Sequence, residues 1–306
     1  MLSARPWKLE AVIRLAASVC LCFFAGYIIS VALPVVSAGK ASGKLLVLDA
    51  LGLACLALAM ILVRRSWADG NAARRLVIVL ICAYSGMLLG FWAQHVAGPG
   101  RTAISTGQML VALASLQGSL LVFVPAFLRE HDLNPIEAFG LTKRWPLALA
   151  LGVLAACLFL PIGNLMQNAT AWLMQNFPVF PMRPVEQSAV HTLRSATSWF
   201  DRLALGGATI VLAPLAEEVL FRGIIYMWIR NLGFPQVALW GTSLAFAIVH
   251  FNLSSLPALF LLAVILTLLY ERTGNLLAPI AAHSLFNTMN LVALYQLETH
   301  LQQQPY

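Results

Sequence analysis

The sequence predicts an all-α fold, a polytopic membrane helix bundle with about eight or nine transmembrane helices. Of its 306 residues, 60% are hydrophobic and only 10% are charged, and the mean hydropathy is +0.82. Apolar runs of about 20 residues, the length that a helix needs to cross a hydrocarbon core of roughly 30 Å, recur along the whole chain. Closed barrels, the other spanning architecture, require an alternating polarity that these runs lack.

Nine segments are predicted to span the membrane. The first continues to about Val36, which is too long for the hydrophobic region of a cleaved signal peptide, so we expect an uncleaved helix there. The last three are short or carry polar residues, and we expect them to be tilted, broken or partly buried behind other helices. The predicted spans are 11–35, 45–63, 76–94, 107–128, 146–164, 203–229, 236–251, 256–270 and 275–296.

Four regions are predicted from the distribution of polar residues. Residues 1–165 form a transmembrane scaffold, because ionisable groups are nearly absent from the spans there. Residues 166–202 contain three prolines and scattered aromatic residues, which favours an interfacial connector over a lid, with 169–177 lying at the membrane surface. Residues 203–296 hold the candidate catalytic helices, and residues 297–306 form a short polar tail.

Basic residues flank the apolar runs, so the net charge of +7 indicates membrane topology and lipid headgroups as partners, with no nucleic acid. Counting Lys and Arg in alternate connections gives eleven on one side and six on the other. The positive-inside rule then places the N-terminus in the cytoplasm. The five cysteines all lie in apolar runs without a CxxC pair, and we expect them to be small buried hydrophobic residues.

The stretch Ala213–Gly223, APLAEEVLFRG, places three charged residues within an apolar run. An ionisable residue at that depth is costly and by default indicates a functional site. Residues four apart share a helical face, so Glu218 and Arg222 are expected to form an ion pair shielded from lipid. Glu217 is rotated by about 100° from Glu218 and is left free for chemistry. Pro214 removes a backbone donor and is expected to loosen the helix where a cavity is needed.

Two later apolar runs carry further polar residues: Phe246 and His250 in one, and His283 and Asn287, four apart, in the other. If the three helices converge, a carboxylate, two imidazoles and a carboxamide meet within the membrane. Such a set suits activation of water by a carboxylate base assisted by histidine, with histidine and asparagine as oxyanion donors. No serine or cysteine is indicated as an alternative nucleophile, because there is no GxSxG motif and every cysteine lies apart from these motifs.

The order EExxxR, FxxxH and HxxxN on successive apolar helices resembles the CPBP family, which comprises CAAX prenyl endopeptidases and bacterial relatives linked to bacteriocin processing and self-immunity, also called the Abi family. The resemblance covers 203–296 and implies a glutamate-dependent intramembrane endopeptidase of a bacterial inner membrane that cleaves a membrane-associated peptide or protein. Because the HExxH spacing is absent and Asn287 is a poor zinc ligand, we expect this enzyme to be metal-independent. It implies that Glu217 activates water with help from His250. It further implies that His283 and Asn287 stabilise the oxyanion, and that Glu218, Arg222 and Phe246 support them.

Other interpretations of the same residues stay open. Glu218 and Arg222 are equally consistent with a structural ion pair, and His283 and Asn287 with hydrogen bonds between helices. A zinc ion at Glu217, His250 and His283 is a further alternative, although no HExxH spacing is present. A proton-coupled transporter and a non-catalytic immunity or scaffold protein are the other functions considered. The sequence leaves the oligomeric state open.

Overall fold

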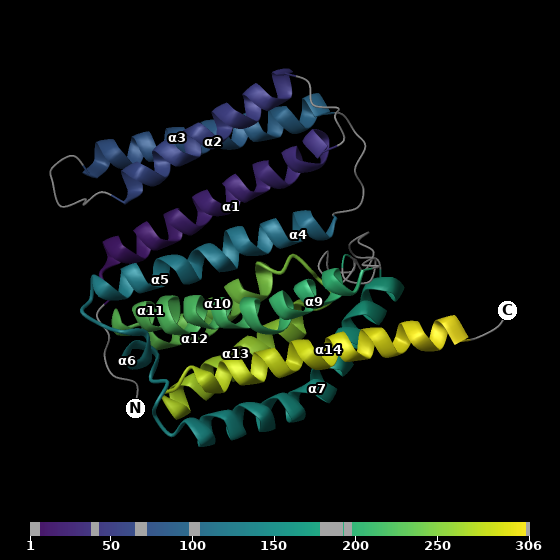
Figure 1. The fold of residues 1–306 in the computed structure, drawn as a ribbon. Helices are drawn as coiled ribbons and strands as arrows, with labels where there is room; N and C mark the ends of the chain where they lie inside the picture. The colour runs from purple at the N-terminus through teal and green to yellow at the C-terminus, as the bar shows by residue number, and fades with distance from the viewer. Residues whose placement is uncertain are drawn as a thin grey trace. The chain divides into compact units, whose positions relative to one another are not determined.

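In the computed structural model, the fold is described for residues 7–37, 43–64, 72–97, 105–177, 192 and 198–303, and all regular structure among them is helical (Figure 1). Helix-forming residues dominate these segments, and a helix satisfies its own backbone polar groups in lipid. The chain divides into two compact units. The N-terminal unit comprises Lys8–Asp132 and Thr192–Leu205, and the C-terminal unit comprises Met1–Trp7, Leu133–His191 and Gly206–Tyr306. The four-region division predicted from the sequence stays a prediction.

The N-terminal unit contains a set of long helices, with α2 packed against both α1 and α3 (Figure 1). A short π-helical segment, η1, joins α4 and α5 into one continuous helix. The helices of this unit are α1 (Leu9–Ser37), α2 (Gly43–Val63), α3 (Ala72–Ala97), α4 (Thr106–Leu113), η1 (Ala114–Gly118), α5 (Ser119–Arg129) and α9 (Trp199–Gly207) as far as Leu205.

The C-terminal unit is built on α7, α12, α13 and α14. Its core is a cluster of buried aromatic and aliphatic side chains that includes Phe159, Phe246, Leu262 and Phe286. Its helices are α6 (Pro135–Phe139), α7 (Trp145–Asn176), the last two residues of α9, η2 (Ala208–Leu212), α10 (Ala213–Glu218), η3 (Val219–Tyr226), α11 (Met227–Asn231), α12 (Pro235–Ile248), α13 (Leu256–Thr273) and α14 (Leu277–Gln303).

Each of the nine predicted spans falls on a helix, except that residues 249–251 follow the end of α12 and residues 275–276 precede α14. Seven helices in the described residues are long and apolar enough to cross a membrane. The predicted span 236–251 corresponds to α12, which has 14 residues and is about 21 Å long, too short for a perpendicular crossing. The predicted span 275–296 is part of α14. The seven candidate spans are Leu9–Ala32, Gly43–Val63, Ala73–Val96, Thr106–Arg129, Trp145–Asn176, Trp199–Asn231 and Leu256–Thr273.

One boundary differs from the sequence prediction. The fifth span was expected to end near residue 164, with 169–177 at the membrane surface, but α7 continues as a single helix to Asn176. Polarity limits how deep a helix lies in lipid, whereas Met, Gln, Ala and Leu in this stretch favour helix in any solvent. Most of the remaining predicted connector, 178–191 and 193–197, lies outside the described residues.

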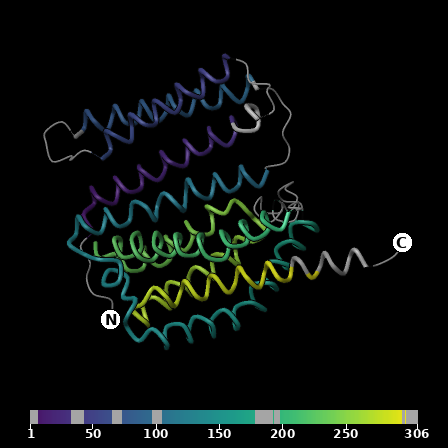
Figure 2. The backbone as a smooth tube through the Cα atoms, viewed as in Figure 1, coloured from purple at the N-terminus to yellow at the C-terminus, as the bar shows by residue number. Residues whose placement is uncertain are grey.

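Close contacts fix α14 beside α7, as the backbone trace also shows (Figure 2). A Cβ atom on Gly152 of α7 would lie 2.4 Å from the carbonyl oxygen of Ala278, so glycine permits the two backbones to touch. At the start of α14, Asn275 is fully buried and donates to the carbonyls of Leu141 and Lys143 at 3.1 and 2.8 Å. The beginning of α14 is therefore held against the turn that precedes α7.

Candidate active site

The helix that carries the two glutamates is a composite of α-helical and π-helical turns. α10, only six residues long, holds Glu217 and Glu218 between the π-helical segments η2 and η3. Short π-helical turns widen a helix and are frequent at functional sites. The sequence predicted loosening around Pro214, and the structure places a π-helical segment directly before that proline.

Pro214 has a specific consequence for the backbone. The N–H of Ala213 donates to the carbonyl of Ala208, five residues earlier. In the same five-residue pattern, the N–H of residue 214 would donate to the carbonyl of Thr209, but Pro214 has no N–H. The side chain of Asn287 on α14 supplies the missing donor, with Nδ2 lying 3.0 Å from the Thr209 oxygen. Asn287 therefore joins α14 to the helix that carries Glu217.

We expect Asn287→Ala to destabilise the protein by about 1 kcal/mol, because the Thr209 carbonyl loses its donor. In a Pro214→Ala background, residue 214 regains an N–H, so the cost of Asn287→Ala should shrink. Unfolding measurements in detergent on the two single variants and the double variant test this coupling. Thr288→Ala is a matched control, since Thr288 donates within its own helix to Ser284. An equal cost in both backgrounds would contradict the role assigned to Pro214.

Glu218 and Arg222 form the ion pair expected from their spacing, with Nη1 and Oε1 2.8 Å apart and both side chains almost completely buried. Arg222 also donates to the carbonyl of Ala263 at 3.0 Å and to the hydroxyl of Thr267 at 3.4 Å. The same Glu218 oxygen lies 2.9 Å from Nδ1 of His283. The carboxylate thus links the helix of Arg222 to α14.

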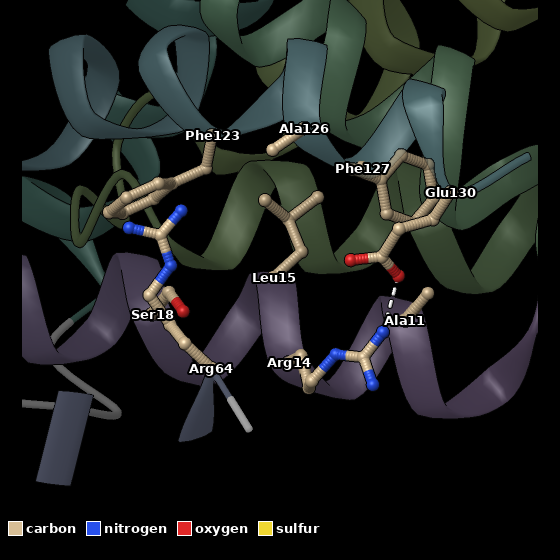
Figure 3. A pocket seen from close by; sticks show the side chains of 9 residues that line it. All are labelled: Ala11, Arg14, Leu15, Ser18, Arg64, Phe123, Ala126, Phe127 and Glu130. Atoms are coloured by element: carbon tan, nitrogen blue, oxygen red, sulfur yellow. Dashed lines mark hydrogen bonds and ion pairs between the residues drawn. The ribbon is translucent and has the colours of Figure 1, made fainter. Parts of the chain in front are cut away.

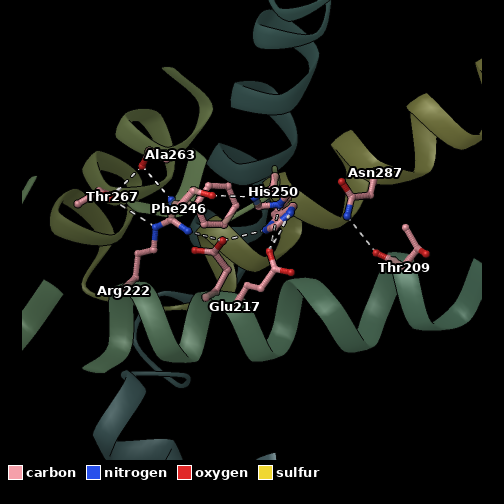
Figure 4. Close-up of polar contacts among 10 residues, drawn as sticks. Thr209, Glu217, Arg222, Phe246, His250, Ala263, Thr267 and Asn287 are labelled. Carbon is pink, nitrogen blue, oxygen red and sulfur yellow. Dashed lines mark hydrogen bonds and ion pairs between the residues drawn. The ribbon is translucent and has the colours of Figure 1, made fainter. Parts of the chain in front are cut away.

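Phe246 lies at the centre of this arrangement (Figure 4). Its fully buried ring faces the guanidinium of Arg222, whose central carbon is 4.6 Å from the ring centroid. The ring of His283 meets it edge-on at 5.6 Å, and the carbonyl of Phe246 lies 2.7 Å from Nδ1 of His250. Phe246 therefore positions both imidazoles and shields the ion pair.

Glu217 faces the two imidazoles. Its Oε2 atom is 3.9 Å from Nε2 of His250 and 3.9 Å from Nε2 of His283. These separations are too long for direct hydrogen bonds, and they fit a water molecule between the groups. Oε2 has no hydrogen-bond partner in the described residues. The side chains of Glu217 and His250 are 20% and 21% exposed, so a substrate can reach them.

The hydrogen bonds of the two imidazoles fix their tautomers. A carbonyl oxygen only accepts, so Nδ1 of His250 carries the hydrogen that it donates to Phe246. The Glu218 oxygen that pairs with Arg222 also accepts from Nδ1 of His283, which gives this ring the same tautomer. In its neutral form each ring then presents an Nε2 lone pair to Glu217. Glu217, His250 and His283 can therefore accept protons from a molecule that lies between them.

Metal binding was tested against the same geometry. Among the described side chains, no group of three or more His, Cys, Asp or Glu residues is arranged to hold a metal ion. Whether zinc binds at Glu217, His250 and His283 can be tested by chelation.

The structure brings six of the seven residues singled out in the sequence into one contiguous cluster. Asn287 is set apart from Glu217 and His250, beside Thr209 (Figure 4). Two contributors escaped sequence reasoning, the carbonyl of Ala263 and the hydroxyl of Thr267. Thr267 is a polar residue in an otherwise apolar run, which was the one available signal.

The same part of the chain matches a known family. The model of the Rce1-like family, described as type II CAAX prenyl endopeptidase Rce1-like, matches residues 199–289. This segment is Rce1-like. The match contains every residue of the cluster, and it confirms the resemblance to the CPBP family that the three motifs indicated. The match to the Rce1-like family and the seven apolar helices together fit an integral membrane protein.

Three curated relatives are each similar to this chain over about a quarter to a third of its length. Uncharacterized protein YpbD of Bacillus subtilis is 36% identical over 83 residues, 26% of this chain and 40% of the relative. UPF0177 protein YxdF of Lactococcus lactis is 35% identical over 98 residues, 31% of this chain and 53% of the relative. An uncharacterized 24.3 kDa protein of Escherichia coli is 40% identical over 92 residues, 27% and 40% of the two chains. The chain thus spans about half the length of these relatives, or less, and no solved structure matches it.

Proposed function

We propose that the protein is an intramembrane endopeptidase that cleaves a membrane-associated peptide or protein with water activated by Glu217, without a metal ion. The observation that carries the proposal is the unpartnered Glu217 oxygen 3.9 Å from the Nε2 atoms of two histidines, inside the Rce1-like segment. A carboxylate and an imidazole at this distance suit general base catalysis through one water.

The chemical step follows from the donors and acceptors around that water. Its oxygen attacks the carbonyl carbon of the scissile peptide bond while one of its protons passes to Glu217. The carbonyl oxygen becomes an oxyanion, for which protonated His283 and the second N–H of Asn287 are the proposed donors, each contributing a few kcal/mol when well placed. The C–N bond then breaks, and the leaving amine takes a proton from Glu217 or His250.

The support around these groups fits that step. Protonated His283 would donate through Nδ1 to Glu218. The buried carboxylate would thus stabilise the imidazolium while Nε2 donates to the oxyanion. His250 is held through Nδ1 by the Phe246 carbonyl and keeps Nε2 toward Glu217. Arg222 neutralises Glu218, which leaves Glu217 as the carboxylate available to take the proton.

Purified full-length protein in detergent, given a panel of membrane peptides, tests the proposal. The panel contains prenylated CAAX peptides, bacteriocin leaders and hydrophobic signal peptides, with products identified by mass spectrometry. Cleavage of one class would assign the substrate. If the protein binds a peptide but cleaves none, the immunity or scaffold alternative is favoured. Proton-coupled uptake of a peptide into vesicles that contain the protein, without proteolysis, would favour transport. A bacterial inner membrane with a cytoplasmic N-terminus is the proposed location.

We expect activity to survive exhaustive chelation, because the proton transfers assigned to Glu217 and His250 require no Lewis acid. Cleavage rates are measured before and after dialysis against a chelator, and again after zinc is restored. The control is a zinc protease treated in the same detergent, which must lose its activity. Loss of cleavage that zinc restores would replace this mechanism by the zinc alternative.

A further inference from the structure

A pocket within the N-terminal unit has no part in the proposed chemistry. It lies between α1, the end of α2 and α5, and its lining includes two arginines, a serine and a glutamate (Figure 3). The polar residues in the lining are Arg14, Ser18, Arg64 and Glu130.

Arg64 directly follows the last residue of α2 and reaches over the ring of Phe123. Its guanidinium carbon is 5.2 Å from the ring centroid. Within the described residues, this guanidinium forms no ion pair with a carboxylate and donates no hydrogen bond. A ring contact satisfies the face of a guanidinium and leaves its N–H edge available.

Ser18 is the second polar group without a partner. The residue is only 5% exposed, and its hydroxyl forms no hydrogen bond in the described part of the chain. Three other serines of this unit, Ser30, Ser115 and Ser119, each donate to a carbonyl three residues earlier. Ser18 and Arg64 both line the pocket (Figure 3). The lining thus offers a hydroxyl and the N–H edge of a guanidinium to a bound group.

The opposite end of the pocket has the opposite charge. Arg14 binds the carboxylates of both Glu10 and Glu130, so two negative charges there meet one positive charge. Leu15 separates this group from Arg64 (Figure 3). An anion is therefore favoured at Arg64 and Ser18 and disfavoured beside Glu130.

The ends of α2 and α5 place Arg64 where phospholipid headgroups lie, since basic residues at span ends mark that layer. Arginine is suited to phosphate because its N–H groups match the phosphate oxygens, and basic pockets between membrane helices bind lipid headgroups. We propose that Ser18 and Arg64 form a binding site for a phosphate group, carried by a membrane phospholipid or present as free phosphate. The site does not depend on the proposed peptidase activity.

Thermal unfolding of the delipidated full-length protein tests the site. Three probes are titrated: short-chain phosphatidylglycerol, the matching diacylglycerol without phosphate, and inorganic phosphate. Phosphatidylglycerol is expected to raise the melting temperature, whereas diacylglycerol is not. We expect Arg64→Gln to weaken the apparent affinity roughly tenfold or more, because a hydrogen bond to a charged group is lost. Arg74→Gln, which removes an exposed arginine outside the pocket, is the matched control and should bind as wild type.

The two sources of phosphate give different results. A response to the lipid alone assigns a lipid headgroup, and an equal response to inorganic phosphate assigns a free anion. An equal response of wild type and Arg64→Gln, or of the lipid and diacylglycerol, would overturn the site. If Arg64→Gln does not fold, Ser18→Ala is tested in the same titration. An affinity for phosphatidylglycerol equal to that of wild type would then overturn the proposed phosphate site.

Discussion

Glu217→Gln is expected to lower the rate of peptide cleavage by roughly 10²- to 10⁴-fold, the contribution typical of a general base. Glutamine keeps the size of the side chain and can still bind water, but it cannot take a proton. Initial rates on the best substrate of the peptide panel measure the effect. Glu137→Gln, a change on the exposed surface of α6, is the matched control and should cleave at the wild-type rate.

Stability separates a catalytic role from a structural one in this variant. Glu217 Oε2 has no hydrogen-bond partner in the described residues, so replacing the carboxylate removes no native hydrogen bond of that atom. We therefore expect the melting temperature of Glu217→Gln to stay the same or to rise. His250→Ala should also lose cleavage, because Nε2 is no longer present to share the proton. Normal cleavage by either variant would exclude the mechanism, whereas lost cleavage with partial unfolding would indicate a structural role.

Helical periodicity was sufficient to predict which side chains of the glutamate helix face each other. The spacing of Glu218 and Arg222 predicted their ion pair, and the pair is present at 2.8 Å although it crosses from α10 into the π-helical η3. It also separated Glu217 from that pair, and Glu217 faces the Nε2 atoms of both histidines. The chemical roles of these residues stay predictions, because geometry alone does not measure a rate.

The π-helical segments and the contact of Asn287 could not be predicted in the same way. A hydrophobic pattern does not report whether a backbone N–H donates four or five residues back, so η2 and η3 have no signature in the sequence. Asn287 meets Thr209 across 78 residues of chain, and such a contact depends on how whole helices pack. The same limit hid Asn275, whose partners Leu141 and Lys143 belong to a distant turn.

Arg222→Met is expected to cost about 3–5 kcal/mol of stability, the largest loss of any single change considered, because it leaves the buried Glu218 carboxylate without its counter-charge. Arg222 and Glu218 are 1% and 0% exposed, so neither water nor ions can replace the lost partner. Arg230→Met is the matched control on the same composite helix. Its ion pair with Glu271 is about one-third exposed and longer, at 3.3 Å, so its loss should cost about 0–1 kcal/mol.

Adding Glu218→Gln to Arg222→Met should restore much of that stability, since the pair is removed as a unit and the two costs are not additive. Glu218→Gln alone keeps an oxygen that can accept from Nδ1 of His283, and Arg222 keeps the Ala263 carbonyl. It removes the charge that would stabilise protonated His283, so we expect slower cleavage with only a modest loss of stability. Unfolding and initial rates of the three variants measure both effects. Full activity in Glu218→Gln would limit the ion pair to a structural role, and additive losses in the double variant would show that the two residues do not act together.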